Sequence, residues 1–213
     1  QAGATDSITH GMDFAMLLTL PAAVAMLIIP VPIISTIFER GEFNAESTRQ
    51  TAAALAGFAV GLPGYVLVRV LQPGYFARED TKRPMIMALI TVAVNIACSL
   101  ALFPFFGHVG IAIATAISAW VNVALLVRGL RGFWKPDSQT LLRLPRMLLA
   151  ALLMGVALWG IHHLSASWFE EGTLMRILGL GMLIITGTTV YFTAAIALKA
   201  TSLQAIKAGF TGR

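Results

Sequence analysis

Six long apolar runs decide what this chain can fold into. They cover residues 14–38, 52–76, 85–106, 109–127, 147–164 and 177–198, and Arg69 is the one Lys, Arg, Asp or Glu within them. A helix of about 20 apolar residues crosses the hydrocarbon core of a bilayer and satisfies its own backbone hydrogen bonds there. None of the runs alternates polar and apolar residues as an outer-membrane barrel strand does. We therefore expect an all-α, polytopic transmembrane helical bundle of six spans.

The basic residues of the loops are distributed unequally. With six spans both chain ends lie on one side, and the loops of that side hold eleven Lys and Arg residues against three on the other side. The eleven are Arg78, Lys82, Arg83, Arg128, Arg131, Lys135, Arg143, Arg146, Lys199, Lys207 and Arg213, and the three are Arg40, Arg49 and Arg176. Because cytoplasmic loops are enriched in Lys and Arg, we expect both termini in the cytoplasm.

The net charge of +5 is therefore a topology signal. It also favours contact with anionic membrane lipids. No basic patch interleaved with aromatic residues predicts a nucleic-acid partner.

Two loops carry helix-capping signals. In the stretch PGYFAREDTKRP, which begins at Pro73, Asp80 or Thr81 can cap the third span, and Pro84 is tolerated in its first turn. In the loop after the first span, Asn44 is a candidate N-cap. The first stretch predicts a charged hairpin on the cytoplasmic side.

Three segments in order resemble one family. They are LPAAVAMLIIPVPIISTIFERGEFNAEST from Leu20, VLVRVLQPGYFAREDTKRPM from Val66 and FGHVGIAIATAISAWVNVALL from Phe106. They are similar to the ninth span, the junction of the tenth and eleventh spans, and the twelfth span of the MurJ/MviN lipid II flippases. That family belongs to the MOP superfamily, which also contains multidrug antiporters and polysaccharide flippases.

The resemblance implies a function and a location. It implies the C-terminal six of fourteen spans of a multi-pass protein of the bacterial inner membrane. Such a protein moves lipid II, an undecaprenyl-pyrophosphate-linked peptidoglycan precursor, to the periplasmic leaflet by alternating access. The other partners implied are membrane lipids and the missing N-terminal spans of the same protein.

The expected layout follows from the spans and the resemblance. Residues 1–13 are a cytoplasmic lead-in from upstream spans, and the start at Gln1 without a Met indicates a piece of a longer chain. Residues 14–127 form four spans of a transport lobe, and residues 128–146 form a basic cytoplasmic loop. Residues 147–198 form two appended spans, which we expect to accommodate the lipid tail, and residues 199–213 form a cytoplasmic tail.

Arg69 is the candidate substrate-binding residue. A cation within a span is costly and marks a functional site by default. In the resembling family a cationic cavity receives the pyrophosphate and sugar head group. Since Arg69 lies about two turns from the cytoplasmic end of its span, its side chain can also reach the lipid head groups instead.

Asn95, Ser99 and Thr115 form a candidate ion site. Asn95 and Ser99 share one helix face, four residues apart. Some members of the family bind sodium here with an Asn, an Asp four residues later and a Thr on the next span. Ser99 stands where the acid would be, which favours interhelical hydrogen bonding by Asn95, Ser118 and Asn122 instead.

Six residues are hinge candidates because proline removes a backbone donor and glycine permits close packing. They are Pro21, Pro30, Pro32, Pro63, Pro73 and Gly74. The three in the first span should kink it.

Two observations bear on the alternatives. The adjacent His162 and His163 point about 100° apart on a helix and have no third ligand nearby, so we expect no metal site, no cofactor and no enzyme.

The rival functions are a polysaccharide or multidrug exporter of the same superfamily and a non-transporting membrane scaffold. Ion-coupled drug export needs an intramembrane acid, and the six predicted spans contain no Asp or Glu.

Overall fold

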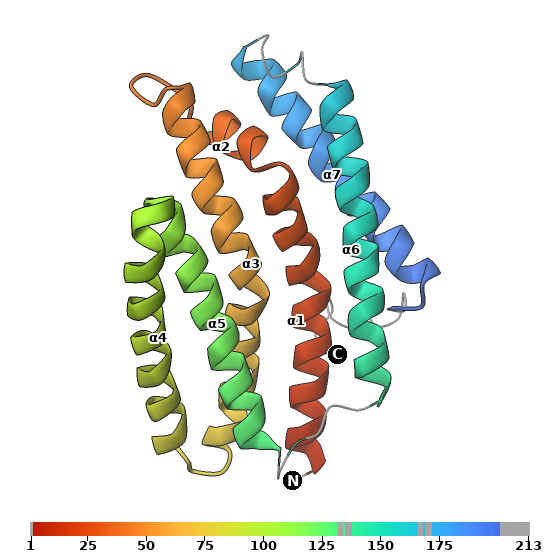
Figure 1. Cartoon of the computed structure of the whole chain (residues 1–213). Helices are drawn as coiled ribbons and strands as arrows, with labels where there is room; N and C mark the ends of the chain where they lie inside the picture. The colour runs from red at the N-terminus through yellow and green to blue at the C-terminus, as the bar shows by residue number, and fades with distance from the viewer. Residues whose placement is uncertain (1, 132–133, 135–137, 166–167, 169–171, 201–213) are drawn as a thin grey trace. The chain divides into compact units, whose positions relative to one another are not determined.

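The chain forms helices throughout most of its length. The computed structural model describes residues 2–131, 134, 138–165, 168 and 172–200 (Figure 1). The helices are α1 (Ala2–Ile28), α2 (Pro30–Phe38), α3 (Ala45–Phe76), α4 (Lys82–Phe106), α5 (His108–Leu130), α6 (Ser138–Leu164) and α7 (Thr173–Ala197). Within the described residues, six of these helices, all except α2, are long and apolar enough to cross a membrane. The predicted all-α fold with six spans is confirmed, and its orientation in the membrane stays a prediction.

The first span differs from the prediction. The apolar span runs over Ile8–Ile28, and the chain breaks at Ile29 before α2 begins. Pro30 and Pro32 have no N–H, so they cannot continue the hydrogen bonding of α1, whereas a proline in the first turn of a new helix is tolerated. Residues 14–38 therefore contain a helix end and a second short helix, instead of one kinked helix.

The other hinge candidates lie inside continuous helices. Pro21 is within α1, and Pro63, Pro73 and Gly74 are within α3. A hinge role for any of the six residues stays a prediction.

The described residues divide into two compact units. Unit 1 comprises those of Gln1–Thr19 and Gly57–Leu144, and unit 2 comprises those of Leu20–Ala56 and Pro145–Arg213. The chain passes from one unit to the other inside α1, α3 and α6. The predicted division into a transport lobe and two appended spans stays a prediction.

In unit 1, α3 and α5 approach each other closely along a line of small residues. A Cβ atom added to Gly57, Gly61 or Gly64 would lie 3.0, 2.7 or 3.3 Å from atoms of Ala112, Ala116 and Ala119, respectively. Without side chains at these positions the two backbones come together, as small residues permit in membrane helices. We call this contact the α3–α5 seam.

Aromatic side chains bridge the seam to backbone carbonyls. The Tyr65 hydroxyl donates to the Thr115 carbonyl at 3.1 Å, and the Trp120 indole N–H donates to the Val60 carbonyl at 2.9 Å. Each bridge joins α3 to α5, so the seam holds the two helices in one register. Helix α4 packs beside α5 in the same unit (Figure 1).

The caps predicted from sequence form where the chain enters α3 and α4. In unit 2 the Asn44 side chain accepts the backbone N–H of Ser47 at 3.0 Å, and so caps α3. In unit 1 the Asp80 carboxylate accepts the N–H of Arg83 at 3.1 Å, while Thr81 makes no capping bond. Of the two residues considered for the α4 cap, Asp80 has this role.

Unit 2 contains close contacts of α6. A Cβ on Gly155 would lie 2.8 Å from the Val24 side chain of α1, and one on Gly187 of α7 would lie 3.0 Å from Leu158. Helices α2 and α7 are also in contact. The absence of a side chain at both glycines therefore lets α6 pack closely on two neighbours.

Candidate functional site

Arg69 lies on an exposed face of α3. None of the described residues forms a hydrogen bond or an ion pair with its guanidinium. The end of α3 at Phe76 is seven positions further along the chain, which is about 10 Å along a helix. An unneutralised cation at this depth needs a negatively charged group, or water, supplied from outside the described chain.

Tyr65 lies one turn before Arg69 on the same face of α3. Its hydroxyl is held by the Thr115 carbonyl of α5, while its side chain remains partly exposed. Sequence reasoning missed Tyr65, because its position relative to α5 follows from the seam and not from any local pattern. Tyr65 is therefore fixed to α5 one helical turn from the position of Arg69.

Asn95 is the centre of a polar network between α4 and α5. Its side-chain N–H groups donate to Thr115 Oγ1 at 3.3 Å and to Ser118 Oγ at 3.1 Å. Ser99 Oγ in turn donates to Asn95 Oδ1 at 3.3 Å. The structure therefore brings together the three residues of the candidate ion site and confirms the predicted interhelical bond between Asn95 and Ser118.

The hydroxyl groups of this network are also engaged. Thr115 Oγ1 donates to the Ile111 carbonyl at 2.7 Å, and Ser118 Oγ donates to the Thr115 carbonyl at 2.8 Å. A hard cation needs several oxygen atoms that converge on one point. Here the amide nitrogen of Asn95 faces the two hydroxyls, an arrangement suited to interhelical hydrogen bonding. An ion-binding role stays untested.

Thr115 connects the two groups within unit 1. Its carbonyl accepts from Tyr65, and its hydroxyl accepts from Asn95. The face that carries Arg69 is therefore linked through α5 to the polar network on α4. The hinge candidates of the first span lie in unit 2.

Two ion pairs could not be foreseen from sequence. Arg143 Nη1 lies 3.0 Å from Asp13 Oδ2 in unit 1, and Arg176 Nη1 lies 3.0 Å from Glu39 Oε1 in unit 2. The partners are 130 and 137 residues apart in the chain. No local pattern could have paired them.

Asp13 corrects an argument made from the sequence. It lies inside the apolar stretch Ile8–Ile28 of α1, with its side chain only 13% exposed. The statement that the spans contain no acid was wrong, because the first span begins earlier than predicted. An ion-coupled exporter is therefore not excluded on that ground.

The aromatic end of α6 lies in unit 2. The His163 ring stacks on Trp159, with ring centroids 5.3 Å apart and planes 16° apart. Such pairs are suited to a membrane–water interface. Within the described residues, no three His, Cys, Asp or Glu side chains are grouped so that they could hold a metal ion.

Comparison with known proteins gives the family. A sequence profile described as lipid II flippase MurJ matches residues 1–179. This chain belongs to the lipid II flippase MurJ family. Membership together with the six apolar helices supports a multi-pass protein of the bacterial inner membrane.

Individual MurJ relatives agree with the profile. The chain is 42% identical over 202 residues to a probable lipid II flippase MurJ of Rhizobium meliloti (strain 1021), covering 93% of this chain and 38% of the relative. It is 33% identical over 211 residues to a probable lipid II flippase MurJ of Vibrio cholerae serotype O1, covering 96% of this chain and 40% of the relative. The chain thus spans about two fifths of the length of these MurJ proteins.

A solved structure shares the fold. It is a lipid II flippase MurJ in an inward closed conformation, with a TM-score of 0.75 and 22% sequence identity. The match covers 100% of this chain and 41% of that one. It supports the helical membrane fold and says nothing about individual side chains.

Proposed function

We propose that this chain is the C-terminal six of fourteen spans of a lipid II flippase. The complete protein moves the lipid-linked peptidoglycan precursor from the cytoplasmic to the periplasmic leaflet by alternating access and is not an enzyme. The family match over residues 1–179 carries the proposal. The relatives bear the same name, and the fold agrees.

Within this chain, Arg69 is the residue proposed to contact the substrate. Its exposed guanidinium has no partner among the described residues, and the pyrophosphate of lipid II supplies the missing negative charge. Guanidinium offers a planar fork of donors that matches phosphate oxygens, which an ammonium group does not reproduce. A lysine at this position keeps the charge and loses the fork.

Growth of flippase-depleted cells that carry the full-length protein tests this role. Arg69→Ala removes a charge-assisted contact worth about 1.5–3 kcal/mol, which corresponds to a loss of roughly tenfold to a hundredfold in transport. Arg69→Lys should retain part of the function. Arg131→Ala, at an exposed position just after α5, is the matched control and should grow normally.

Protein abundance in the membrane fraction must be equal for all variants. Wild-type growth of Arg69→Ala at normal abundance would rule out an essential head-group contact. Recognition would then belong to spans outside this chain. Arg69 would instead reach the lipid head groups at the cytoplasmic interface.

Ion-coupled export of a drug or polysaccharide is the second candidate, because α1 holds a carboxylate. Asp13 pairs with Arg143 through Oδ2, while Oδ1 is buried without a hydrogen-bond partner among the described residues. If the chain is part of an ion-coupled drug exporter, Asp13→Asn raises drug susceptibility in the intact cell. Under the lipid II proposal it leaves drug susceptibility unchanged.

A further inference from the structure

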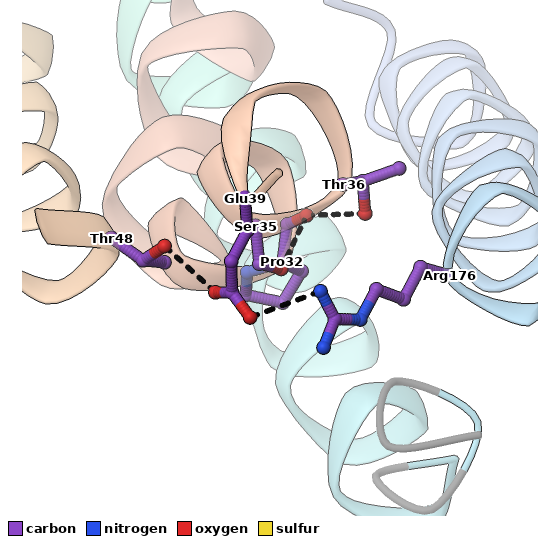
Figure 2. Close-up of polar contacts among 6 residues, drawn as sticks. All are labelled: Pro32, Ser35, Thr36, Glu39, Thr48 and Arg176. Carbon is purple, nitrogen blue, oxygen red and sulfur yellow. Dashed lines mark hydrogen bonds and ion pairs between the residues drawn. The ribbon is translucent and has the colours of Figure 1, made fainter. Parts of the chain in front are cut away.

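Three segments of unit 2 meet at the Glu39 carboxylate. Glu39 follows α2, Thr48 lies in the first turn of α3 and Arg176 lies in the first turn of α7. Thr48 Oγ1 donates to Glu39 Oε2 at 2.7 Å, and Arg176 Nη1 donates to Glu39 Oε1 at 3.0 Å (Figure 2). Each carboxylate oxygen is therefore bound to a different helix.

The carboxylate and its partners are largely shielded from water. The side chains of Arg176 and Glu39 are 23% and 20% exposed, and Thr48 is 2% exposed. The nearby pair of Arg49 and Glu46 is different, with a separation of 3.8 Å and side chains 76% and 63% exposed. Shielded, charge-assisted hydrogen bonds are stronger than solvated ion pairs. The pair of Arg176 and Glu39 should therefore stabilise the fold more than the pair of Arg49 and Glu46.

The surroundings of Glu39 fix its position. Its backbone N–H donates to the Ser35 carbonyl at 3.2 Å and so ends α2. The hydroxyls of Ser35 and Thr36 both donate back to the Pro32 carbonyl, at 3.3 and 2.7 Å (Figure 2). These hydroxyl protons are thus used inside α2, and Glu39 provides the polar link from α2 to α7.

The connection between α2 and α3 is short. Phe43 N–H donates to the Arg40 carbonyl at 3.1 Å, and Gly41 has a φ of +58° within this turn. The Asn44 cap then starts α3, which places Thr48 one turn later. Glu39 and Thr48 are held together by local structure, so Arg176 is the partner that arrives from a distant part of the chain.

We propose that Glu39 is the centre of a permanent clasp, formed with Thr48 and Arg176, that fastens the start of α7 to the end of α2 and the start of α3. These three segments move as one body through the working cycle. Separating α7 would leave a shielded carboxylate without its cation and would also break the contact between α2 and α7. Any opening that admits or releases a substrate lies elsewhere. This clasp does not depend on which substrate the protein carries.

Thermal stability of the purified full-length protein tests whether the clasp holds. Arg176→Ala should lower the melting temperature by several degrees, whereas Arg49→Ala should not change it. Thr48→Val, which removes one of the two bonds and keeps the shape of the side chain, should give a smaller drop. Combining Glu39→Arg with Arg176→Glu should recover part of the loss seen with either change alone. Equal melting temperatures for Arg176→Ala and Arg49→Ala would overturn the proposal.

A covalent replacement tests whether the clasp stays closed. Glu39→Cys and Arg176→Cys are combined in the full-length protein with Cys98→Ala, and a short bismaleimide joins the two new thiols. Transport measured in membrane vesicles should be lower without the cross-linker and recover when the link is formed. The single-cysteine variants treated with the same reagent are the controls.

Two results separate this proposal from its alternatives. Transport that stops when the two cysteines are joined, with the single-cysteine controls unaffected, shows that the pair must open and overturns the permanent clasp. If the wild-type vesicles move no lipid II, the proposed function fails. The clasp is then decided by the melting temperatures alone.

Discussion

Gly61 offers the sharpest test of the α3–α5 seam. The substitution Gly61→Ala adds a Cβ at 2.7 Å from the Ala116 Cα and 3.0 Å from its Cβ, whereas carbon atoms in ordinary contact are about 3.5–4.0 Å apart. The nearest atom belongs to the backbone of α5, so no side-chain rotation relieves the clash. The two helices must separate by close to an ångström, which weakens the contacts along the whole seam.

The magnitude follows from two opposing terms. Inserting a methyl group into a well-packed contact costs about 1–3 kcal/mol, while replacing glycine by alanine inside a helix gains about 1 kcal/mol. Gly160→Ala in α6 isolates the second term, because a Cβ there has nothing within 4 Å. The difference between the two variants therefore reports the packing cost of the seam.

Melting curves of the full-length protein in detergent measure this difference. We expect Gly61→Ala to melt about 1–3 °C below Gly160→Ala, since about 1 kcal/mol shifts the melting temperature by only roughly 1 °C in a protein of which this chain is about two fifths. A melting temperature for Gly61→Ala equal to or above that of Gly160→Ala would refute the close approach of α3 and α5. The loss of the Tyr65 bond to Thr115 should accompany the packing defect.

Three further predictions concern topology, the polar network and a cap. With single cysteines in a Cys98→Ala background, an impermeant thiol reagent should label position 44 but not position 80 in cells with a permeabilised outer membrane; the reverse would contradict the cytoplasmic termini. Asn95→Leu removes three hydrogen bonds of 3.1–3.3 Å and should cost about 1–2 kcal/mol; sodium-dependent stabilisation of the wild type that this change abolishes would instead establish an ion site. Asn44→Ala removes the cap of α3 and should cost about 1 kcal/mol in thermal unfolding, and an unchanged stability would show that the cap contributes nothing.

The sequence predicted those features that depend on neighbouring residues. The ends of spans at Phe76, Phe106 and Leu164 follow from the apolar runs and agree with the structure. The caps at Asn44 and Asp80 follow from short-range rules. Local chemistry is sufficient for the caps because each capping bond joins residues three positions apart.

The features that sequence reasoning missed depend on tertiary contacts or on competing effects. The periodicity of apolar residues cannot show that Arg176 pairs with Glu39. Nor can it show that Thr115 accepts hydrogen bonds from both Tyr65 and Asn95. The first span was misplaced because apolar composition continues through Ile29, while the missing N–H groups of the prolines decide the break. For the Arg69 site, the cation and its distance from the end of the span could be predicted from the sequence, and the structure added the bond that joins Tyr65, one turn earlier, to α5.

The length of α3 indicates that the clasp lies in the lipid head-group layer and outside the hydrocarbon. Its 32 residues extend about 48 Å, against a hydrocarbon thickness of about 30 Å. A tilt of about 20°, the average for membrane helices, shortens its projection only slightly. At least one end of α3 therefore stands in the head-group layer, and the polar first turn with Thr48 is the end suited to it. The head-group layer, unlike the hydrocarbon, contains other cations. Lipid amines and dissolved cations there compete with Arg176 for the Glu39 carboxylate. The bilayer composition around the protein thereby becomes part of what determines how firmly α7 is held.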